Sequence, residues 1–314
     1  MHVVAVARRT QAKETIITHT HPSFDDQATL WNGPAGRAWV EMQELLDHVF
    51  KPFENLLVDA VSCSPATRIL DVGCGTGTTT LAIARRSSTK GRCVGVDISE
   101  PMLALARERA EREDTPATFI HGDAQTYSFE PMRFDVILSR FGVMFFDDAR
   151  RAFANLRRAA AGDAELCFIA WRSAAENPFM TTAERAAAPL LPDVPARRPD
   201  KPGQFAFADQ DRVHALLEDG GWSEINIRPL DVECTLPEKD LVRYLTRLGP
   251  VGQVLQKTDE PTRTQIIETV RAAFERYVHG AEVRFTAACW MVHARARPAS
   301  PLSGLVCQAP DSKR

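Results

Sequence analysis

The sequence predicts an α/β fold with a doubly wound, mainly parallel sheet, and three observations lead to it. Strand-like and helix-like segments alternate from about residue 65 onwards, which is typical of a parallel sheet covered by helices. The first of these strands, 69–72, continues directly into a turn with three glycines. The second strand, 93–97, ends in an aspartate. In such folds a ligand binds at the carboxyl ends of the strands, so we expect the binding site there.

The composition is that of a globular protein rather than of a nucleic-acid binder. The chain has 314 residues, of which 44% are hydrophobic and 25% are charged, and its formal net charge is −3. Without a global basic field, we expect no nucleic-acid partner. No apolar run approaches the roughly 18 residues of a membrane span, and no signal peptide is indicated, so we expect a cytoplasmic protein. The seven scattered cysteines contain no C-x-x-C pair, which predicts reduced thiols and no metal site.

A helical segment is predicted before the first strand. Apolar side chains recur at helical spacing from Met42 to Leu57. Pro52 lies inside this pattern and is expected to divide it into two helices. These helices can bury their apolar faces only by packing over the main sheet.

The first strand and its turn indicate a close approach to a ligand. Residues 69–72 form a short apolar run that suits a buried parallel strand. Gly73, Gly75 and Gly77 then allow the backbone to reverse where a Cβ would collide. The helix that follows presents its N-terminal amides to the same space. A dinucleotide fingerprint would have its third glycine at position 78, where this chain has Thr78.

The next strands supply polar groups at the same edge of the sheet. Asp97 ends the second strand, where a carboxylate can accept hydrogen bonds from both hydroxyls of a ribose. Ile98 and Met102 follow and provide apolar surface for an adenine ring. A third strand begins at Thr118 and leads into an acidic loop, and a fourth covers 134–139.

This ordered series, with Asp71-Val-Gly-Cys-Gly-Thr-Gly77, Asp97 and the loop at Asp123, resembles the class I S-adenosylmethionine (SAM) dependent methyltransferases. Within that class it is similar to the small-molecule enzymes of ubiquinone and menaquinone biosynthesis, over roughly residues 65–172. The resemblance implies a seven-stranded Rossmann-like sheet with an antiparallel last strand. It also implies SAM as cofactor, S-adenosylhomocysteine as product and a small molecule as methyl acceptor. The residues expected to bind the cofactor are Asp71, Gly73, Cys74, Gly75, Thr76, Gly77, Asp97, Ile98, Met102, Asp123, Ala124, Gln125 and Ser139.

The rest of the chain is expected to complete this core and to add a mainly helical cap. A proline-rich stretch at 192–202 indicates a lid, and 238–278 is predicted to be helical. The predicted segments are a flexible N-terminal arm (1–22), an N-terminal helical cap segment (23–62), the SAM-binding core (63–172), a lid or cap insertion (173–208), a core helix and strand (209–236), a helical cap insertion (237–281), the final core strand (282–296) and a flexible tail (297–314).

The cap and the strand ends are expected to enclose the substrate. In the resembled family, the N-terminal segment folds across the cofactor and lines the substrate cavity. Arg140 and Arg172 follow strands four and five, where either could hold an acidic substrate or the cofactor carboxylate. For the aromatic residues, plain core packing remains an alternative. The predicted substrate contacts are Trp31, Trp39, Arg140, Phe141, Met144, Trp171 and Arg172.

The expected reaction is methyl transfer to an oxygen or carbon of a small, largely apolar acceptor, with an acidic acceptor as one option. Alignment of the reacting atoms in a dry pocket can supply most of the acceleration, so the sequence indicates no indispensable catalytic residue. His279 and His214 are the candidates for a general base, although structural or surface roles are favoured for both.

Two alternatives to this function stay open. The chain could be a non-catalytic SAM-binding or interaction protein, because no catalytic residue identifies an enzyme. It could also be an NAD-dependent oxidoreductase, against which the missing glycine at position 78 argues. The oligomeric state is open as well, with a homodimer as one option.

Overall fold

The computed structural model describes residues 24–61, 67–87, 92–191 and 201–296. The predicted N-terminal arm and C-terminal tail lie outside these ranges, as does most of the proline-rich stretch. Within the described ranges, no helix combines the length and the apolar character that crossing a bilayer requires.

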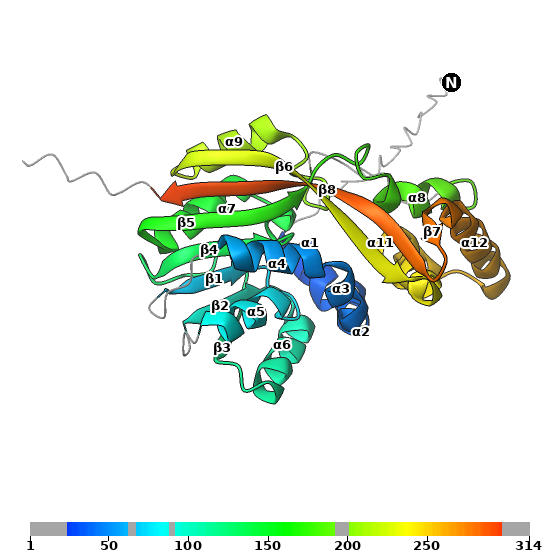
Figure 1. The fold of residues 1–314 in the computed structure, drawn as a ribbon, viewed down its shortest axis with the longest axis horizontal. Coiled ribbons are helices and arrows are strands. Elements are labelled where there is room, and N and C mark those ends of the chain that lie inside the picture. Colours follow the sequence, from blue (N-terminus) through cyan, green and yellow to red (C-terminus); the bar gives the residue numbers. More distant parts are fainter. Residues whose placement is uncertain (1–23, 62–66, 88–91, 192–200, 297–314) are drawn as a thin grey trace, which may run out of the picture.

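One continuous sheet runs through the molecule in the order β3-β2-β1-β4-β5-β8-β6 (Figure 1). Neighbouring strands from β3 to β5 are parallel, whereas β8 is antiparallel to both β5 and β6. This is the predicted doubly wound sheet with its antiparallel last strand. The strands are β1 (Ile69–Val72), β2 (Cys93–Asp97), β3 (Ala117–His121), β4 (Phe134–Arg140), β5 (Ala160–Trp171), β6 (Trp222–Pro237) and β8 (Glu282–Ala296), with a two-residue β7 (Val278–His279) paired to β8 that the sequence did not predict.

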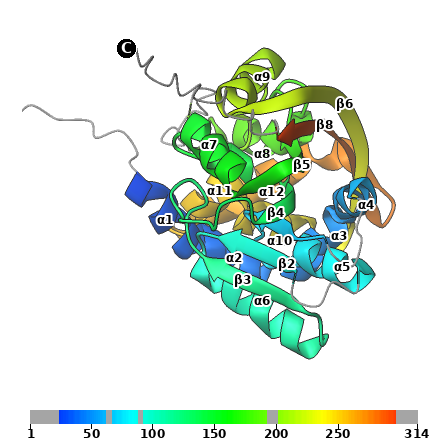
Figure 2. The same cartoon turned by 90° about the vertical axis from the view of Figure 1, so that its left-hand side faces the viewer.

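Helices cover both faces of the sheet, as a doubly wound fold requires (Figure 2). The helices α4 (Lys51–Ala60) and α5 (Thr78–Ser87) pack together on one face, and α7 (Ala149–Ala159) and α9 (Gln210–Asp219) on the other. A further helix, α6 (Glu100–Arg112), packs on β2 and β3. Both α7 and α9 begin at an aspartate whose side chain accepts hydrogen bonds from backbone N–H groups of the first turn.

The apolar pattern from Met42 to Leu57 forms two helices, as predicted, and two more helices precede it. The N-terminal segment thus forms α1 (Phe24–Asn32), α2 (Pro34–Glu41), α3 (Gln43–Val49) and α4. The breaks fall at Asn32–Gly33, Met42 and Phe50, and Pro52 lies in the first turn of α4. Proline is tolerated there because the N–H groups of a first turn have no partner within the helix. The last of these helices, α4, packs over β4, β5 and β6 of the main sheet, as expected.

The cap lies at the ends of two strands that extend beyond the rest of the sheet. Both β6 and β8 continue past the neighbouring β5 as a twisted two-stranded ribbon (Figure 1). At its far end lie α8 (Pro178–Ala187), α10 (Leu241–Arg247), α11 (Gly249–Leu255) and α12 (Glu260–Ala273), with 3₁₀ turns at Glu238–Asp240 and Glu275–Tyr277. The ring of Phe179 on α8 stacks on that of Phe285 on β8, with centroids 3.8 Å apart. This contact joins the cap to the ribbon.

Candidate functional site

The glycine turn after β1 brings the backbone close to a second loop. Gly73, Gly75 and Gly77 all have positive φ, at 66°, 55° and 83°. A Cβ on Gly73 would lie 2.7 Å from the Cα of Gly142, a backbone atom that cannot move aside, so this position requires glycine. A Cβ on Gly75 would meet the side chain of Met102 at 2.8 Å. The turn therefore packs directly against the loop after β4 and against α6.

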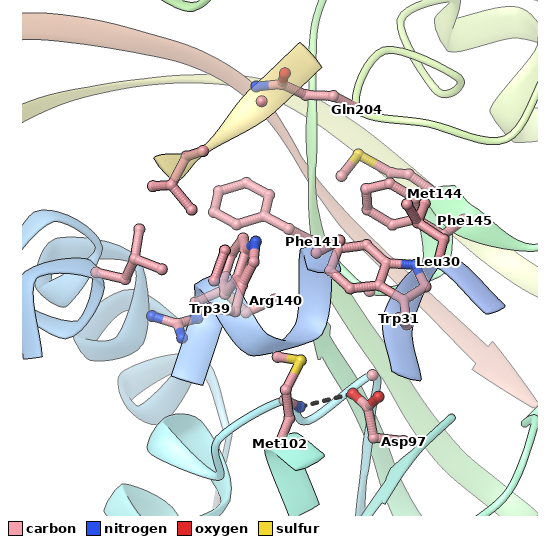
Figure 3. A pocket seen from close by; sticks show the side chains of 18 of the residues that line it. Leu30, Trp31, Trp39, Asp97, Met102, Arg140, Phe141, Met144, Phe145 and Gln204 are labelled. Atoms are coloured by element: carbon pink, nitrogen blue, oxygen red, sulfur yellow. Dashed lines mark hydrogen bonds between the residues drawn. The ribbon is translucent and has the colours of Figure 1, made fainter. Parts of the chain in front are cut away.

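Asp97 holds this turn in place from the end of β2. Its Oδ2 accepts a hydrogen bond from the Gly75 N–H and its Oδ1 from the Ser99 N–H, each at 2.8 Å (Figure 3). Burial raises the pKa of Asp97, while backbone hydrogen bonds from Ser99, Gly75 and Ile98 oppose the shift. A carboxylate has about four acceptor sites, so beside these backbone hydrogen bonds Asp97 keeps acceptor capacity for a ribose hydroxyl.

A third polar loop follows β3. Asp123 accepts hydrogen bonds from the Gln125 N–H and the Thr126 hydroxyl, which fixes its carboxylate at the cavity edge. The side chain of Gln125 is buried and accepts from the Asp148 N–H at 2.8 Å. Asn32 of α1 reaches over and donates to the carbonyl oxygen of Ile98 at 2.9 Å. These bonds tie the N-terminal helices to the nucleoside end of the site.

Beyond these loops lies one cavity of about 390 Å³, walled largely by aromatic side chains (Figure 3). Trp31 meets Phe145 edge to face, with centroids 5.1 Å apart. Phe141 stacks on Trp171 at 4.8 Å and does so with a φ of 64°, a strained value for a bulky residue and one typical of functional sites. The cap completes the wall with Phe179, Met180, Gln204, Tyr244, Leu248 and Phe274.

A buried ion pair joins the cap to the glycine turn. Arg109 of α6 is 6% exposed, and its guanidinium donates to the carbonyl oxygen of Thr76 and to Asp47 of α3, both at 2.8 Å. Asp47 also accepts a hydrogen bond from the hydroxyl of Thr78. Neither charged residue was expected at the site, because an arginine on a charged helix is usually solvated. The only signal was its place at the edge of the apolar face of α6.

Most of the predicted cofactor residues line this cavity, but two do not. The lining contains Asp71, Gly73, Cys74, Gly75, Thr76, Asp97, Ile98, Met102, Asp123, Ala124 and Gln125. Gly77 is not among the lining residues, and its Cα packs near Ala106 and Phe119. Ser139 is buried below the cavity, where its hydroxyl donates to the carbonyl oxygen of Val72 at 2.7 Å and accepts from the Gly142 N–H. It supports the two loops rather than the cavity wall.

Most of the predicted substrate residues also line the cavity, with one exception. Trp31, Trp39, Arg140, Phe141, Met144 and Trp171 all line the cavity. Arg172 does not: its guanidinium is paired with Glu176 and Asp231 at 2.9 Å and lies over the ring of Trp290. The candidate bases are also elsewhere. His214 pairs with Glu218 on the outer helix α9, and His279 is exposed in β7.

Cys74 contributes shape rather than a reactive thiolate. Burial and the nearby carboxylates of Asp97 and Asp71 hold the pKa of its thiol well above the ordinary value. The thiol is therefore neutral at physiological pH.

Among the acids of the site, Asp71 has the most strongly raised pKa. It is 1% exposed, it accepts a hydrogen bond from the Thr80 hydroxyl at 2.6 Å, and burial raises its pKa to about 7. A carboxyl whose pKa is raised by folding binds more protons in the folded than in the unfolded state between about pH 4 and pH 7. The free energy of unfolding therefore falls as the pH rises through this window and is then constant.

We expect Asp71→Asn to raise the free energy of unfolding at pH 8 by about 4 kcal/mol, and at pH 5 by about 1.5 kcal/mol. The amide keeps the shape and the Thr80 hydrogen bond but carries no charge to bury. Urea unfolding of both proteins at the two pH values measures the effect. An equal change at pH 5 and pH 8 would show that Asp71 does not titrate between them.

Comparison with known proteins agrees with this geometry. A family model described as a methyltransferase domain matches residues 69–162, from β1 into β5. A demethylmenaquinone methyltransferase from Renibacterium salmoninarum is 27% identical over 215 residues, which cover 66% of this chain and 88% of that protein. A nocamycin O-methyltransferase from Saccharothrix syringae is 34% identical over 118 residues, 37% of this chain and 42% of that protein. The crystal structure of the YcgJ protein from Bacillus subtilis shares the fold, with a TM-score of 0.53 at 16% identity over 78% of this chain and 98% of that chain.

Proposed function

We propose, from the premise that this chain is a class I SAM-dependent methyltransferase of small molecules, that its acceptor is a flat, largely apolar molecule methylated on oxygen or carbon. One observation carries the proposal. A single cavity extends from Asp97, at the ribose position, to the aromatic side chains of the cap. Cofactor and acceptor therefore share one enclosed space, in which the two reacting atoms can be held close and in line.

The residues present fit the cofactor. The glycine turn lines the cavity from Gly73 to Thr76, and Asp97 offers its carboxylate oxygens to the ribose. Asp123 stands at the adenine end, with Ile98 and Met102 as apolar neighbours. When bound, the cofactor supplies an electrophilic methyl group on a sulfonium. The chain itself orients both ligands and excludes water from the space between them.

The wall of the cavity favours an acceptor that is already acidic. No histidine is among the lining residues in the described part of the chain, and Asp71, the lining acid whose pKa is raised to about 7, lies beside the glycine turn at the cofactor end of the cavity. A phenol, an enol or a carboxylic acid can lose its proton to water before the methyl transfer. A protonated amine would instead have to lose both its charge and its hydration in an aromatic environment. The two relatives named above act, by their names, on a demethylmenaquinone and on an oxygen of nocamycin.

The two other functions receive no support from these relatives. A non-catalytic SAM-binding protein would not need a cavity that extends beyond the cofactor position to the cap. An NAD-dependent oxidoreductase would need space at the third glycine position, where Thr78 instead donates a hydrogen bond to Asp47.

We expect the purified protein to release S-adenosylhomocysteine from SAM in the presence of phenols, hydroquinones or β-dicarbonyl acids, but not with primary or secondary amines. Met180 lies on α8 in the cap half of the cavity. Met180→Trp should raise the KM for a working acceptor at least tenfold by filling that half, without changing the Kd for S-adenosylhomocysteine. Met180→Leu, which conserves the volume, is the matched control. Turnover of amines alone would contradict the proposed acceptor class.

A further inference from the structure

Arg140, at the end of β4, is a half-buried cation that has no ion-pair partner among the described residues. Its side chain lines the cavity, and its Nη1 atom is sealed from solvent with no hydrogen-bond partner in the described residues (Figure 3). Its guanidinium carbon lies over the ring of Phe50, 5.9 Å from the ring centroid. Burial lowers the pKa of Arg140, but an arginine side chain remains charged in proteins. A charged group with an atom sealed from solvent in this way needs a partner.

The acids around Arg140 do not supply that partner. Asp47, Asp71 and Glu54 all act on it through their charge, yet each is bonded to another residue. Asp47 pairs with Arg109, Asp71 accepts from Thr80, and Glu54 pairs with Lys51. A ligand anion in the cavity would therefore find a guanidinium that the described part of the protein has left unpaired.

The strand order identifies which ligand atoms reach this point. Adenine is expected at the loop after β3 and ribose at Asp97 after β2, and the glycine turn follows β1. The next strand in the sheet is β4, which carries Arg140. Three strand spacings, about 14 Å, separate β3 from β4. A cofactor that starts at β3 and crosses β2 and β1 thus presents its amino-acid tail to Arg140.

A second unpartnered group lies on the same cavity wall. The hydroxyl of Thr79, in the first turn of α5, is buried without a hydrogen-bond partner in the described residues. The backbone N–H groups of that first turn add a favourable potential for an anion. A guanidinium and a hydroxyl donor that line the same cavity are suited to the two oxygens of one carboxylate.

We propose that Arg140, assisted by Thr79, binds the carboxylate at the methionine end of the cofactor. The proposal rests on the proposed function and deepens it, because it assigns Arg140 to binding of the cofactor instead of the acceptor. Asp71, 1% exposed beside the same turn, is then left to face the ammonium group of that tail. The aromatic wall and the cap are then left to the acceptor.

The test compares SAM with decarboxylated SAM, which lacks only the carboxylate, by calorimetric titration of the full chain. We expect Arg140→Met to weaken binding of SAM at least tenfold and to leave binding of decarboxylated SAM within twofold of the wild type. Arg140→Lys should recover part of the loss. Arg295→Met is the matched control, because this arginine is paired with Glu165 outside the cavity. It should change neither affinity.

Other outcomes would overturn the proposal in distinguishable ways. If Arg140→Met left the affinity for SAM unchanged but raised the KM for an acidic acceptor, Arg140 would bind the acceptor instead. Equal losses for both ligands would indicate a general disturbance of the site. If Arg140→Met did not fold, Thr79→Val, which conserves the shape, should still weaken SAM selectively, by about threefold. A wild-type protein that binds neither ligand would refute the proposed function together with this assignment.

Discussion

Asp97→Ala is expected to weaken binding of S-adenosylhomocysteine at least a hundredfold, or about 2.7 kcal/mol. Two losses add in this variant. The carboxylate no longer accepts a hydrogen bond from the ribose, and hydrogen bonds to a charged group contribute about 1.5–3 kcal/mol. The Gly75 and Ser99 N–H groups also lose their acceptor, so the glycine turn is released from the end of β2. Calorimetric titration of both proteins measures the change in Kd.

Asp97→Asn separates these two losses. The amide oxygen can still accept from one backbone N–H, so the turn is held while the charge is removed. We expect an intermediate loss, about tenfold, with a smaller change in thermal stability than in the alanine variant. An alanine variant with the wild-type Kd would show that the ribose does not lie against Asp97.

Arg109→Met is expected to lower the free energy of unfolding by about 3 kcal/mol, because it leaves the charge of Asp47 uncompensated in a half-buried position. The same change frees the carbonyl oxygen of Thr76 at the glycine turn. The cap helix α3 and the turn then keep only the hydrogen bond from Thr78 to Asp47, so cofactor binding should weaken as well. Urea unfolding and calorimetric titration report the two effects separately.

Arg112→Met is the matched control for this prediction. Arg112 lies on the same helix, but its side chain is 59% exposed and its contacts with Glu108 and Glu113 are 3.9 Å long. Its removal should change the free energy of unfolding by less than about 0.5 kcal/mol. Combining Arg109→Met with Asp47→Asn should recover part of the loss, because the unpaired charge is then gone. Strictly additive losses would mean that the two residues do not act as a pair.

The parts of the site that lie within one short stretch could be predicted. The turn from Gly73 to Gly77 has a backbone that only glycine adopts easily, and its composition shows this directly. Asp97 and Asp123 could be placed because parallel strands end at the same edge, so an acid just after a strand must face the ligand side. Ser139 occupies a similar position in its strand, but its hydroxyl points to Val72, a detail of side-chain direction that spacing does not reveal.

The two arginines at the ends of β4 and β5 show what the position of a residue relative to its strand does not predict. Arg140 and Arg172 have the same relation to their strands, and the sequence treats them alike. In the structure, Glu176 and Asp231 pair with Arg172 outside the cavity, whereas Arg140 lies in it without a counterion among the described residues. Asp231 is 59 residues away in the chain from Arg172, so only the tertiary structure brings the pair together.

By itself, the sequence determined the series of parallel strands, the glycine turn and the acids of the nucleoside end, because these depend on local backbone preferences and on the geometry of parallel sheets. The tertiary structure alone decided the enclosure of the cavity. Its walls come from α1, from the loop after β4 and from cap helices near Phe179 and Tyr244, and its link to the turn joins Asp47 to Arg109 across 62 residues. Contacts of this kind depend on how packed helices fit one another, which no periodicity within a single segment encodes.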